Sequence, residues 1–253
     1  RYYELDGKRH GHPPLGYAGR QLSAEYHCIH GNPKHIKANI QCVRSIAPEI
    51  TGIVFAPVAA SLAMLDQEFM KAGALVIDMG AGTTDYVLYS NGSIAASGCV
   101  PLGGNDITHE IHRATGISTE LAEQLKIKTG NAYGIPGLDI EVARVINSET
   151  LSSTKVRRKL INRIIRFTLQ NILSRIQQDL SADILDRPEI QLYLTGGGCQ
   201  QKGVRNLVGD TFGIPVNYLG PENCPRCGGK FWKPQHSTVI GLLHYAHLME
   251  NGS

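Results

Sequence analysis

The sequence predicts an α/β protein, and three features indicate this class. Residues 74–77 are all apolar and run into a Gly-rich turn, which is typical of a buried strand. Residues 86–90 and 93–100 form two further strands around Asn91-Gly92, a strong hairpin signal. Helical stretches lie before and after this hairpin, and the longest, residues 155–186, carries an apolar stripe along one face.

The composition is that of an ordinary globular protein. The chain has 253 residues, 42% of them hydrophobic and 19% charged, which fits one large or two small domains. A formal net charge of +3 is too small to indicate nucleic-acid binding. The six cysteines are scattered apart from one pair, as expected in a reducing compartment, and we recognise neither a signal peptide nor a membrane-spanning run. The chain starts at Arg1 without a Met, so we expect a fragment or a trimmed start.

The segments before the central hairpin predict a small strand–helix–strand unit. Residues 1–20 are rich in turn signals, and residues 21–29 alternate loosely like a strand. Apolar residues then recur at helical spacing over residues 34–48, and residues 50–55 are expected to form a short strand. Pro57 suits the first turn of the next helix, residues 58–70.

The turn after residues 74–77 has the residue types of an anion site. Asp78 ends the strand, and we expect Gly80 and Gly82 to adopt positive φ and to let the backbone approach a ligand. Thr83 and Thr84 add hydroxyl groups. Backbone N–H groups in such a turn can bind an anion, and an adjacent carboxylate could hold Mg²⁺ or orient a water. A purely structural Gly-rich turn is the alternative, and no P-loop motif occurs.

Two helix starts follow the hairpin. Gly103-Gly104-Asn105-Asp106 predicts the N-cap of a helix over residues 107–114, either a second phosphate contact or an ordinary cap. Ser118 opens the next helix, where Glu123 and Lys126 share one face. A surface ion pair is the simpler interpretation of these two residues.

The second half of the chain predicts strands at residues 138–145, 189–194 and 216–219, and a helix at residues 204–212. Thr195-Gly196-Gly197-Gly198 follows the middle strand and suits close packing against a flat base or sugar. The long helix has a basic side, which is either a solvated face or a docking surface: Arg157, Arg158, Lys159, Arg163 and Arg166. A final helix starts at Ser237 or Thr238, and we expect four of its residues to face inward: Val239, Leu242, Leu243 and Ala246.

Cys224 and Cys227 have the spacing of a zinc knuckle. A structural Zn²⁺ needs four ligands, and only His236 lies nearby in the sequence. A loop with incidental thiols is therefore the preferred interpretation, with a metal site as the alternative.

The order of the motifs is more specific than any one of them. V-I-D-M-G-A-G-T-T-D, P-L-G-G-N-D, A-E-Q-L-K-I-K and L-T-G-G-G occur in this order. The series resembles the actin-like ATPase superfamily of sugar kinases, heat-shock chaperones and actins. Within it, P-L-G-Y-A-G-R-Q-L at 14–22, P-V-A-A-S-L-A at 57–63 and A-E-Q-L-K-I-K-T-G at 122–130 resemble the bacterial cell-division family FtsA.

The resemblance implies an actin-like, ribonuclease H-like fold with two lobes around a nucleotide cleft, each lobe on a mixed five-stranded sheet. The first strand hairpin, with its D-x-G-S/T loop, is expected before residue 1, so the N-terminal part of the first lobe is missing. The implied segments follow the chain: a small subdomain (1–50), the remainder of the first lobe (51–73), the second lobe (74–117), a nucleotide-contacting insertion (118–165), the second lobe again (166–235) and a helix returning to the first lobe (236–253).

The resemblance also implies the site residues for ATP or ADP. Asp78 would be the catalytic carboxylate, which orients Mg²⁺ through water. The implied nucleotide contacts fall into a phosphate group and a nucleoside group: Gly80, Ala81, Gly82, Thr83 and Thr84 with Gly103 and Gly104 for the phosphates, and Glu123, Lys126, Gly196, Gly197 and Gly198 for ribose and base.

The implied function is assembly rather than fast catalysis. The family resemblance implies filaments and recruitment of division proteins, including the ring protein FtsZ. It places them at the cytoplasmic face of the inner membrane, which is reached indirectly or through segments outside this chain. Ala56 stands where many superfamily ATPases position the attacking water with Glu or Gln, so hydrolysis is expected to be slow at most. The alternatives are a pilus scaffold such as PilM, a small-molecule kinase, and a scaffold that binds no nucleotide.

Overall fold

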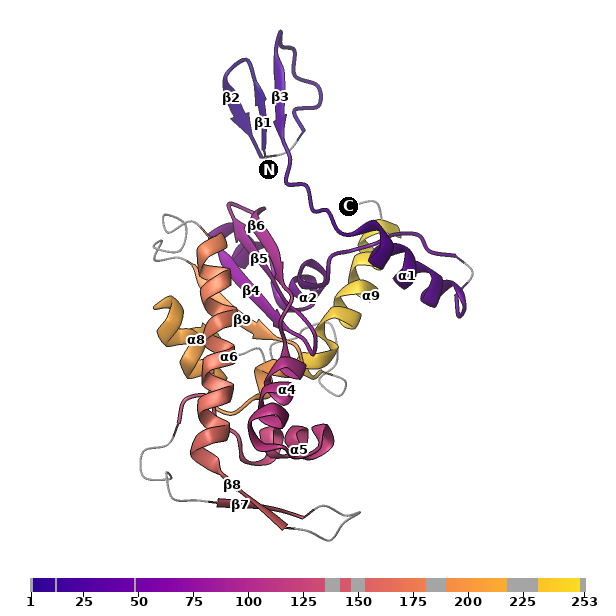
Figure 1. Ribbon diagram of the computed structural model, residues 1–253. Coiled ribbons are helices and arrows are strands. Elements are labelled where there is room, and N and C mark those ends of the chain that lie inside the picture. The colour runs from indigo at the N-terminus through magenta and orange to yellow at the C-terminus, as the bar shows by residue number, and fades with distance from the viewer. Residues whose placement is uncertain are drawn as a thin grey trace.

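The centre of the molecule is a five-stranded mixed sheet with the strand order β10-β9-β4-β5-β6 (Figure 1). Its strands are β4 (Ala74–Met79), β5 (Thr84–Ser90), β6 (Ser93–Val100), β9 (Gln191–Thr195) and β10 (Val216–Asn217). β4 pairs in parallel with β9 and antiparallel with β5, so it lies in the middle of the sheet. The computed structural model describes residues 2–11, 13–47, 49–134, 142–146, 153–180, 190–217 and 232–250.

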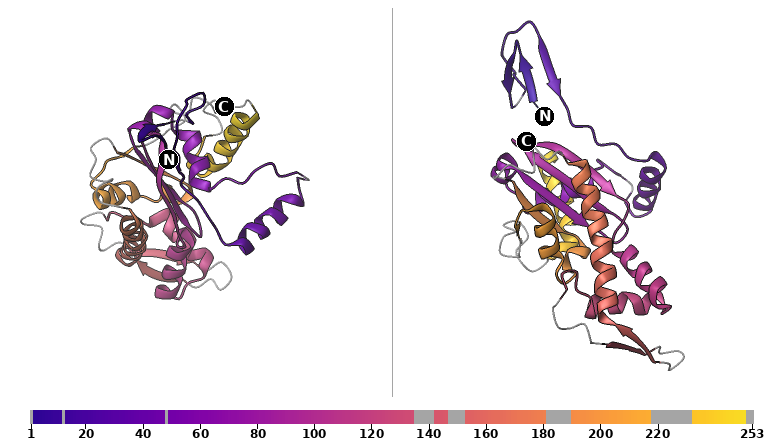
Figure 2. Two further views of the ribbon diagram at one scale, coloured as in Figure 1. Left: turned by 90° about the horizontal axis from the view of Figure 1, so that it is seen from above. Right: turned by 60° about the vertical axis from the view of Figure 1, so that its left-hand side comes forward.

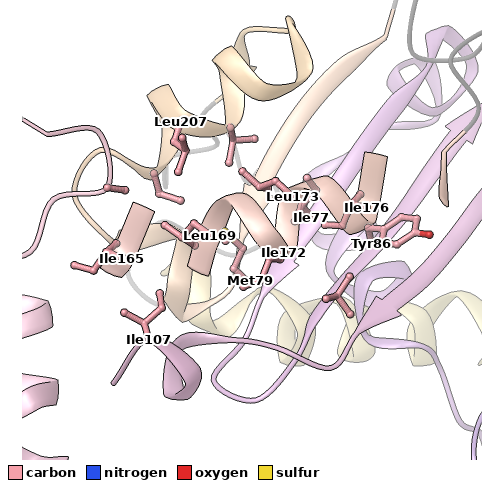
Figure 3. Close-up of a cluster of buried hydrophobic side chains, with 14 of the residues drawn as sticks. Ile77, Met79, Tyr86, Ile107, Ile165, Leu169, Ile172, Leu173, Ile176 and Leu207 are labelled. Carbon is pink, nitrogen blue, oxygen red and sulfur yellow. The ribbon is translucent and has the colours of Figure 1, made fainter. Parts of the chain in front are cut away.

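Helices cover both faces of this sheet. Leu75, Ile77 and Met79 of β4 point to one face, where they pack against α6 (Arg158–Asp179) and α8 (Val204–Phe212). Figure 3 shows the apolar stripe of α6 lying over these strands, between Ile107 and Leu207. Ala74 and Val76 point to the other face, against α2 (Ala56–Met64). Because side chains alternate along a strand, an all-apolar β4 requires cover on both sides, and the two helical layers supply it.

The remaining elements extend this core. α3 (Gln67–Ala72) leads into β4, and α4 (Gly104–Thr115) and α5 (Thr119–Thr129) follow the hairpin. β7 (Val142–Ile146) and β8 (Ser153–Arg157) form a two-stranded sheet before α6. The short helices η1 (Gly197–Gln200) and η3 (Pro234–His236) precede α8 and α9 (Ser237–Glu250). None of the helices in the described part of the chain is long and apolar enough to cross a membrane.

The N-terminal elements stand away from the central sheet. β1 (Tyr2–Leu5), β2 (Lys8–His10) and β3 (Leu22–Glu25) form an antiparallel sheet, followed by α1 (Pro33–Arg44). Figures 1 and 2 show both on extended connections, and no described residue before position 48 is buried. A hydrogen bond of 2.8 Å between His27 Nε2 and Ser97 Oγ connects this region to β6.

The strand–helix–strand prediction for this region is confirmed for its first strand and its helix and is wrong for its second strand. Residues 1–20 contain β1 and β2, and the strand predicted over residues 21–29 shortens to β3. Residues 50–55 are irregular and α1 buries no residue, so its apolar spacing did not reflect a packed face. The turn signals at Asp6-Gly7 were real, since both residues have positive φ, but they join two strands.

Several other boundaries also change. The helix predicted over residues 58–70 is two helices, α2 and α3, because the chain becomes extended at Leu65. The long helix begins at Arg158, after the unpredicted strand β8, and its predicted end lies outside the described residues. The hairpin turn is confirmed by positive φ at Asn91 and Gly92, and the predicted bounds of β6 and α8 are confirmed.

The inward face predicted for the last helix is also wrong. Val239 and Leu243 of α9 are 61% and 70% exposed. The buried residues of α9 are Ser237 and Gly241, and a Cβ on Gly241 would overlap the carbonyl oxygen of Ala59 in α2. Two helices that approach this closely need small residues at the contact, so the larger apolar residues point elsewhere.

Candidate nucleotide site

A cavity of about 380 Å³ opens beside the ends of β4 and β9, within the size range of small-molecule sites. Its walls come from the β4–β5 loop, the start of α4, α5, η1 and the middle of α6. The lining combines main-chain atoms of glycines, apolar side chains and a few polar groups: Met79, Gly80, Ala81, Thr84, Gly103, Gly104, Asn105, Ile107, Glu123, Lys126, Ile127, Leu169, Ile172, Gly197, Gly198, Gln200 and Gln201.

The β4–β5 loop offers main-chain donors at one end of this cavity. The N–H of Gly80 donates to the carbonyl of Thr83 at 2.9 Å and closes the turn. Within the described part of the chain, no main-chain acceptor is recorded for the N–H groups of Ala81 and Gly82, which are exposed. Two adjacent N–H groups of this kind can bind a phosphate oxygen.

The prediction of positive φ at Gly80 and Gly82 is wrong, since neither has it. Gly80 is instead required by close approach, because a Cβ there would lie 2.9 Å from the carbonyl oxygen of Thr83. Nothing lies within 4 Å of a Cβ built on Gly82. The turn is therefore tight at Gly80 and open at Gly82.

The two threonines of the loop differ in burial. The Thr84 hydroxyl is buried and donates to the carbonyl of Leu102 at 2.9 Å, so its proton is already used. The Thr83 hydroxyl is exposed and donates to Asp85 Oδ2 at 3.1 Å. Thr84 lines the cavity, whereas Thr83 and Gly82 lie outside its lining.

The start of α4 is fastened to this loop. The N–H of Gly104 donates to the carbonyl of Gly80 at 3.0 Å, and that of Asn105 donates to the carbonyl of Ala81 at 2.8 Å. The Asp106 carboxylate accepts the N–H of Gly103 at 2.7 Å and completes the cap. A Cβ on Gly103 would lie 2.6 Å from the carbonyl oxygen of Ala81, so this contact needs glycine. The first amides of α4 therefore shape the loop.

Glu123 and Lys126 form a partly buried network on the α5 wall of the cavity, next to the start of α4. Lys126 Nζ lies 2.6 Å from Glu123 Oε2, and the exposed fractions of their side chains are 10% and 41%. Thr108 donates to the same Glu123 oxygen. Burial alone would raise the pKa of Glu123, but the hydrogen bonds from Lys126 and Thr108 outweigh it and lower that pKa. The pair is therefore not a simple surface ion pair, and Glu123 presents a charged carboxylate to the cavity.

Asp78 lies beneath the loop and is not part of the cavity lining. Its Oδ2 accepts the hydroxyl of Thr238 at 3.0 Å, at the start of α9. Burial raises the pKa of Asp78, the Thr238 hydrogen bond lowers it, and the charge of Asp85 raises it further. Mg²⁺ in nucleotide sites is held by one or two carboxylates together with phosphates. One Asp78 oxygen is free of Thr238, so the residue can hold a water for the ion but does not face the cavity directly.

The Gly run after β9 packs on the end of β4. Gly196 has φ +82°, and a Cβ there would overlap Asp78 Oδ1. A Cβ on Gly198 would lie 2.9 Å from the carbonyl oxygen of Met79. Gly197 and Gly198 line the cavity, whereas Gly196 lies behind it and supports Asp78. These glycines bring η1 against the sheet. Their predicted packing against a base or sugar stays a prediction.

Sequence reasoning missed two glutamines of this site. Gln200 and Gln201 line the cavity, and Gln201 Nε2 donates to the carbonyl of Gly130 at 2.9 Å, just after α5. Their position directly after the Gly run was the available signal. Cys224 and Cys227 lie outside the described residues, and the described ones contain no cluster of three or more metal-binding side chains.

The sheet order and the Gly-lined cavity at the strand ends define an actin-like α/β protein. Solved structures with this fold include MreB5 of Spiroplasma citri bound to ADP, with a TM-score of 0.67 and 15% identity over 87% of this chain and 67% of that one. A PilM–PilN type IV pilus biogenesis complex matches with a TM-score of 0.57 and 20% identity over 83% of this chain and 57% of that one. The predicted fold class is confirmed.

The sequence profile of cell division protein FtsA matches residues 75–241, which is more than half of the chain. The chain therefore belongs to the FtsA family. It is 30% identical to FtsA of Borreliella burgdorferi over 96% of this chain and 59% of the relative. It is 29% identical to that of Bacillus subtilis over 97% of this chain and 55% of the relative, and 24% identical to that of Escherichia coli K12 over 96% and 60%. The chain thus spans less than two thirds of these relatives.

Proposed function

We propose that this chain is a nucleotide-binding assembly protein of the bacterial division apparatus and that its cavity holds ATP or ADP. The observation that carries the proposal is the cavity itself, whose walls include the β4–β5 loop with its main-chain N–H groups and the Glu123–Lys126 pair. Membership of the FtsA family supports the division role. Structures of the similar-fold MreB5 bound to ADP and to AMPPNP support the choice of ligand.

In this proposal the nucleotide lies across the cavity with its phosphates at the β4–β5 loop. Gly80, Ala81, Gly82, Thr83 and Thr84 surround the phosphates. Gly103 and Gly104 set the shape of that loop from the side of α4. The N–H groups of Ala81 and Gly82 have no main-chain acceptor among the described residues, which favours this orientation, since anions bind where main-chain donors converge.

The nucleoside occupies the other end of the cavity. Glu123 and Lys126 form its polar side, and the charged Glu123 carboxylate is suited to accept ribose hydroxyls. Gly196, Gly197 and Gly198 let η1 lie along the adenosine. The apolar residues Leu169 and Ile172 of α6 supply surface for the base.

We further propose that Asp78 orients Mg²⁺ through a water when the nucleotide brings the ion. The ion would neutralise phosphate charge. Asp78 would use the oxygen that does not accept from Thr238. Ala56 starts α2 and does not line the cavity, so no side chain at that position activates a water and hydrolysis is slow at most.

Assembly and partners belong to the same proposal. We infer self-association into filaments and recruitment of division proteins, including FtsZ, at the cytoplasmic face of the inner membrane. Membrane contact is indirect or made through segments outside this chain. The proposed units are those of the sequence analysis: residues 1–50, 51–73, 74–117, 118–165, 166–235 and 236–253. Family membership supports this inference.

Calorimetric titration with ADP, with and without Mg²⁺, tests the site. We expect micromolar binding, about −8 kcal/mol. Glu123→Gln keeps the shape of the side chain but loses its charge, so ADP binding should weaken about tenfold. Glu120→Gln is the matched control, because Glu120 is exposed on the same helix and lies outside the cavity lining. A chain that binds no ADP would instead support the alternative of a scaffold without nucleotide.

A further inference from the structure

The ammonium group of Lys126 is fully occupied by the protein. Its Nζ lies 2.9 Å from the carbonyl oxygen of Gly104, 2.9 Å from Thr108 Oγ1 and 2.6 Å from Glu123 Oε2. A lysine ammonium has three hydrogens to donate, and three acceptors surround this one. The side chain is 10% exposed. Although Lys126 lines the cavity, it has no donor left for a ligand.

The acceptor at Gly104 connects Lys126 to the phosphate end of the cavity. The N–H of Gly104 donates to the carbonyl of Gly80, and the next N–H, that of Asn105, donates to the carbonyl of Ala81. Lys126 thus bonds the carbonyl of Gly104, and the N–H of the same residue bonds the β4–β5 loop. A continuous series of hydrogen bonds runs from Glu123 through Lys126 and Gly104 to Gly80.

We propose that Lys126 is a positioning residue that connects the nucleoside end of the cavity to its phosphate end. It fixes the first turn of α4, and through it the loop that receives the phosphates, while Glu123 is the member of the pair that bonds the nucleoside. The inference rests on the proposed function for its ligand, but the connection itself exists without nucleotide. A buried ammonium that loses its acceptors is costly, so the network keeps one arrangement.

A positioning role and a direct contact predict losses of affinity for different parts of the ligand. If Lys126 contacted the nucleoside directly, its removal would weaken the binding of adenosine and of ADP by the same factor. If it positions the loop, its removal lets the start of α4 and the loop move, and the loss falls on the phosphates. Adenosine carries no phosphate, so its affinity should hardly change.

Lys126→Met tests the proposal, because methionine fills the same space without donors. We expect ADP binding to weaken about tenfold or more, while adenosine binding changes less than about twofold. Lys128→Met is the matched control, because Lys128 is exposed on the same helix and lies outside the cavity lining. It should leave both affinities unchanged. An equal loss for adenosine and ADP in Lys126→Met would overturn the proposal.

Hydrogen exchange without nucleotide separates this inference from the proposed function. The amides of Gly104 and Asn105 should exchange faster in Lys126→Met than in the Lys128→Met control, even if the chain binds no ADP. Unchanged exchange at these two amides would overturn the positioning role, whatever ADP does. Thr108→Val, which removes one acceptor of Lys126, should shift both readouts in the same direction and covers the case in which Lys126→Met does not fold.

Discussion

The Asp78 carboxyl group lies at the end of β4, where it is 9% exposed and faces the start of α9. A carboxylate is stabilised at a helix N-terminus by the helix dipole and by the Thr238 hydroxyl. Burial and the charge of Asp85 oppose this, and the net result is a raised pKa for Asp78. The folded protein therefore binds the Asp78 proton more tightly than the unfolded chain does.

Replacing this group should stabilise the protein at neutral pH. Because the pKa of Asp78 is raised in the folded protein, ionisation of this group lowers the free energy of unfolding. The full loss applies at pH values above the folded pKa. No loss remains at pH values well below the usual pKa of 3.8. Asp78→Asn keeps an acceptor for Thr238 and carries no charge. We expect the free energy of unfolding in urea at pH 7 to be higher than in the original chain, with the difference disappearing well below pH 3.8.

Thr238→Val is the companion variant, because it removes the hydrogen bond and leaves the charge. It should destabilise the protein at pH 7, and the loss should shrink in acid. A pH-independent effect of Asp78→Asn would show that its charge does not control stability. If Asp78 also holds a water for Mg²⁺, the loss of stability from its ionisation is the cost of a functional carboxylate in a buried position.

The contact between α2 and α9 depends on one glycine. Gly241 lies against the main chain of Ala59, so closely that a Cβ at position 241 would overlap the Ala59 carbonyl oxygen. α2 offers a surface of small residues there, with Ala59, Ala60 and Ala63 buried. This contact brings the start of α9, with Thr238, to Asp78.

Gly241→Ala should therefore destabilise the protein, although alanine is normally the better helix former. We expect a loss of about 2–3 kcal/mol in urea unfolding, because the helices must separate to admit the methyl group. Gly209→Ala in α8 is the control, since a Cβ there meets the nearest atom at 3.5 Å, an ordinary contact. That variant should be neutral or stabilising by up to about 1 kcal/mol. Equal effects of the two substitutions would contradict the close contact.

Elements that carry their own local signal were predictable from the sequence. Adjacent residues are enough to predict three of them: the hairpin around Asn91-Gly92, the Ser118 cap and the buried strand β4. α9 was not, because it is apolar nearly all round and its inward face is decided by Gly241 meeting Ala59, far away in the sequence. The predicted helix of the N-terminal unit forms as α1, but its helical spacing does not show that a packing partner exists.

The candidate site shows the same division. The glycines at 80, 103, 104, 197 and 198 were found from the sequence, and all line the cavity. The structural role of these glycines differs in part from the predicted one. Most of them allow main chains to approach closely, and none of the five has a positive φ. The occupied state of Lys126 and the position of Asp78 below the cavity depend on contacts between distant elements, which no local pattern records.

At the scale of the whole molecule, the N-terminal sheet has β2 and β3 as its outer strands, and neither pairs with another described strand. β1 lies between β2 and β3, so both outer strands offer main-chain groups to another chain. Large apolar side chains on and beside this sheet are exposed, and such surfaces mark contact sites. They are Leu15 at 85%, Tyr17 at 67%, Leu22 at 59% and Tyr26 at 67%.

If the chain self-associates, this sheet is the expected contact. Leu22→Lys should weaken self-association measured by sedimentation velocity about tenfold, because a charge replaces an apolar group on an outer strand. Phe167→Lys is the control, since Phe167 is 72% exposed on α6, away from that sheet. Neither change should alter the unfolding midpoint. An equal loss in both variants would place the contact elsewhere or make it nonspecific.

Beside the β4–β5 loop, the cavity is bounded largely by peptide groups rather than by side chains. Peptide groups are the same in every sequence, so such a wall needs only a few glycines to remain glycine. Side chains elsewhere can then drift during evolution without altering the shape that a ligand meets. Relatives that are 24–30% identical to this chain can therefore keep the same cavity shape despite very different sequences.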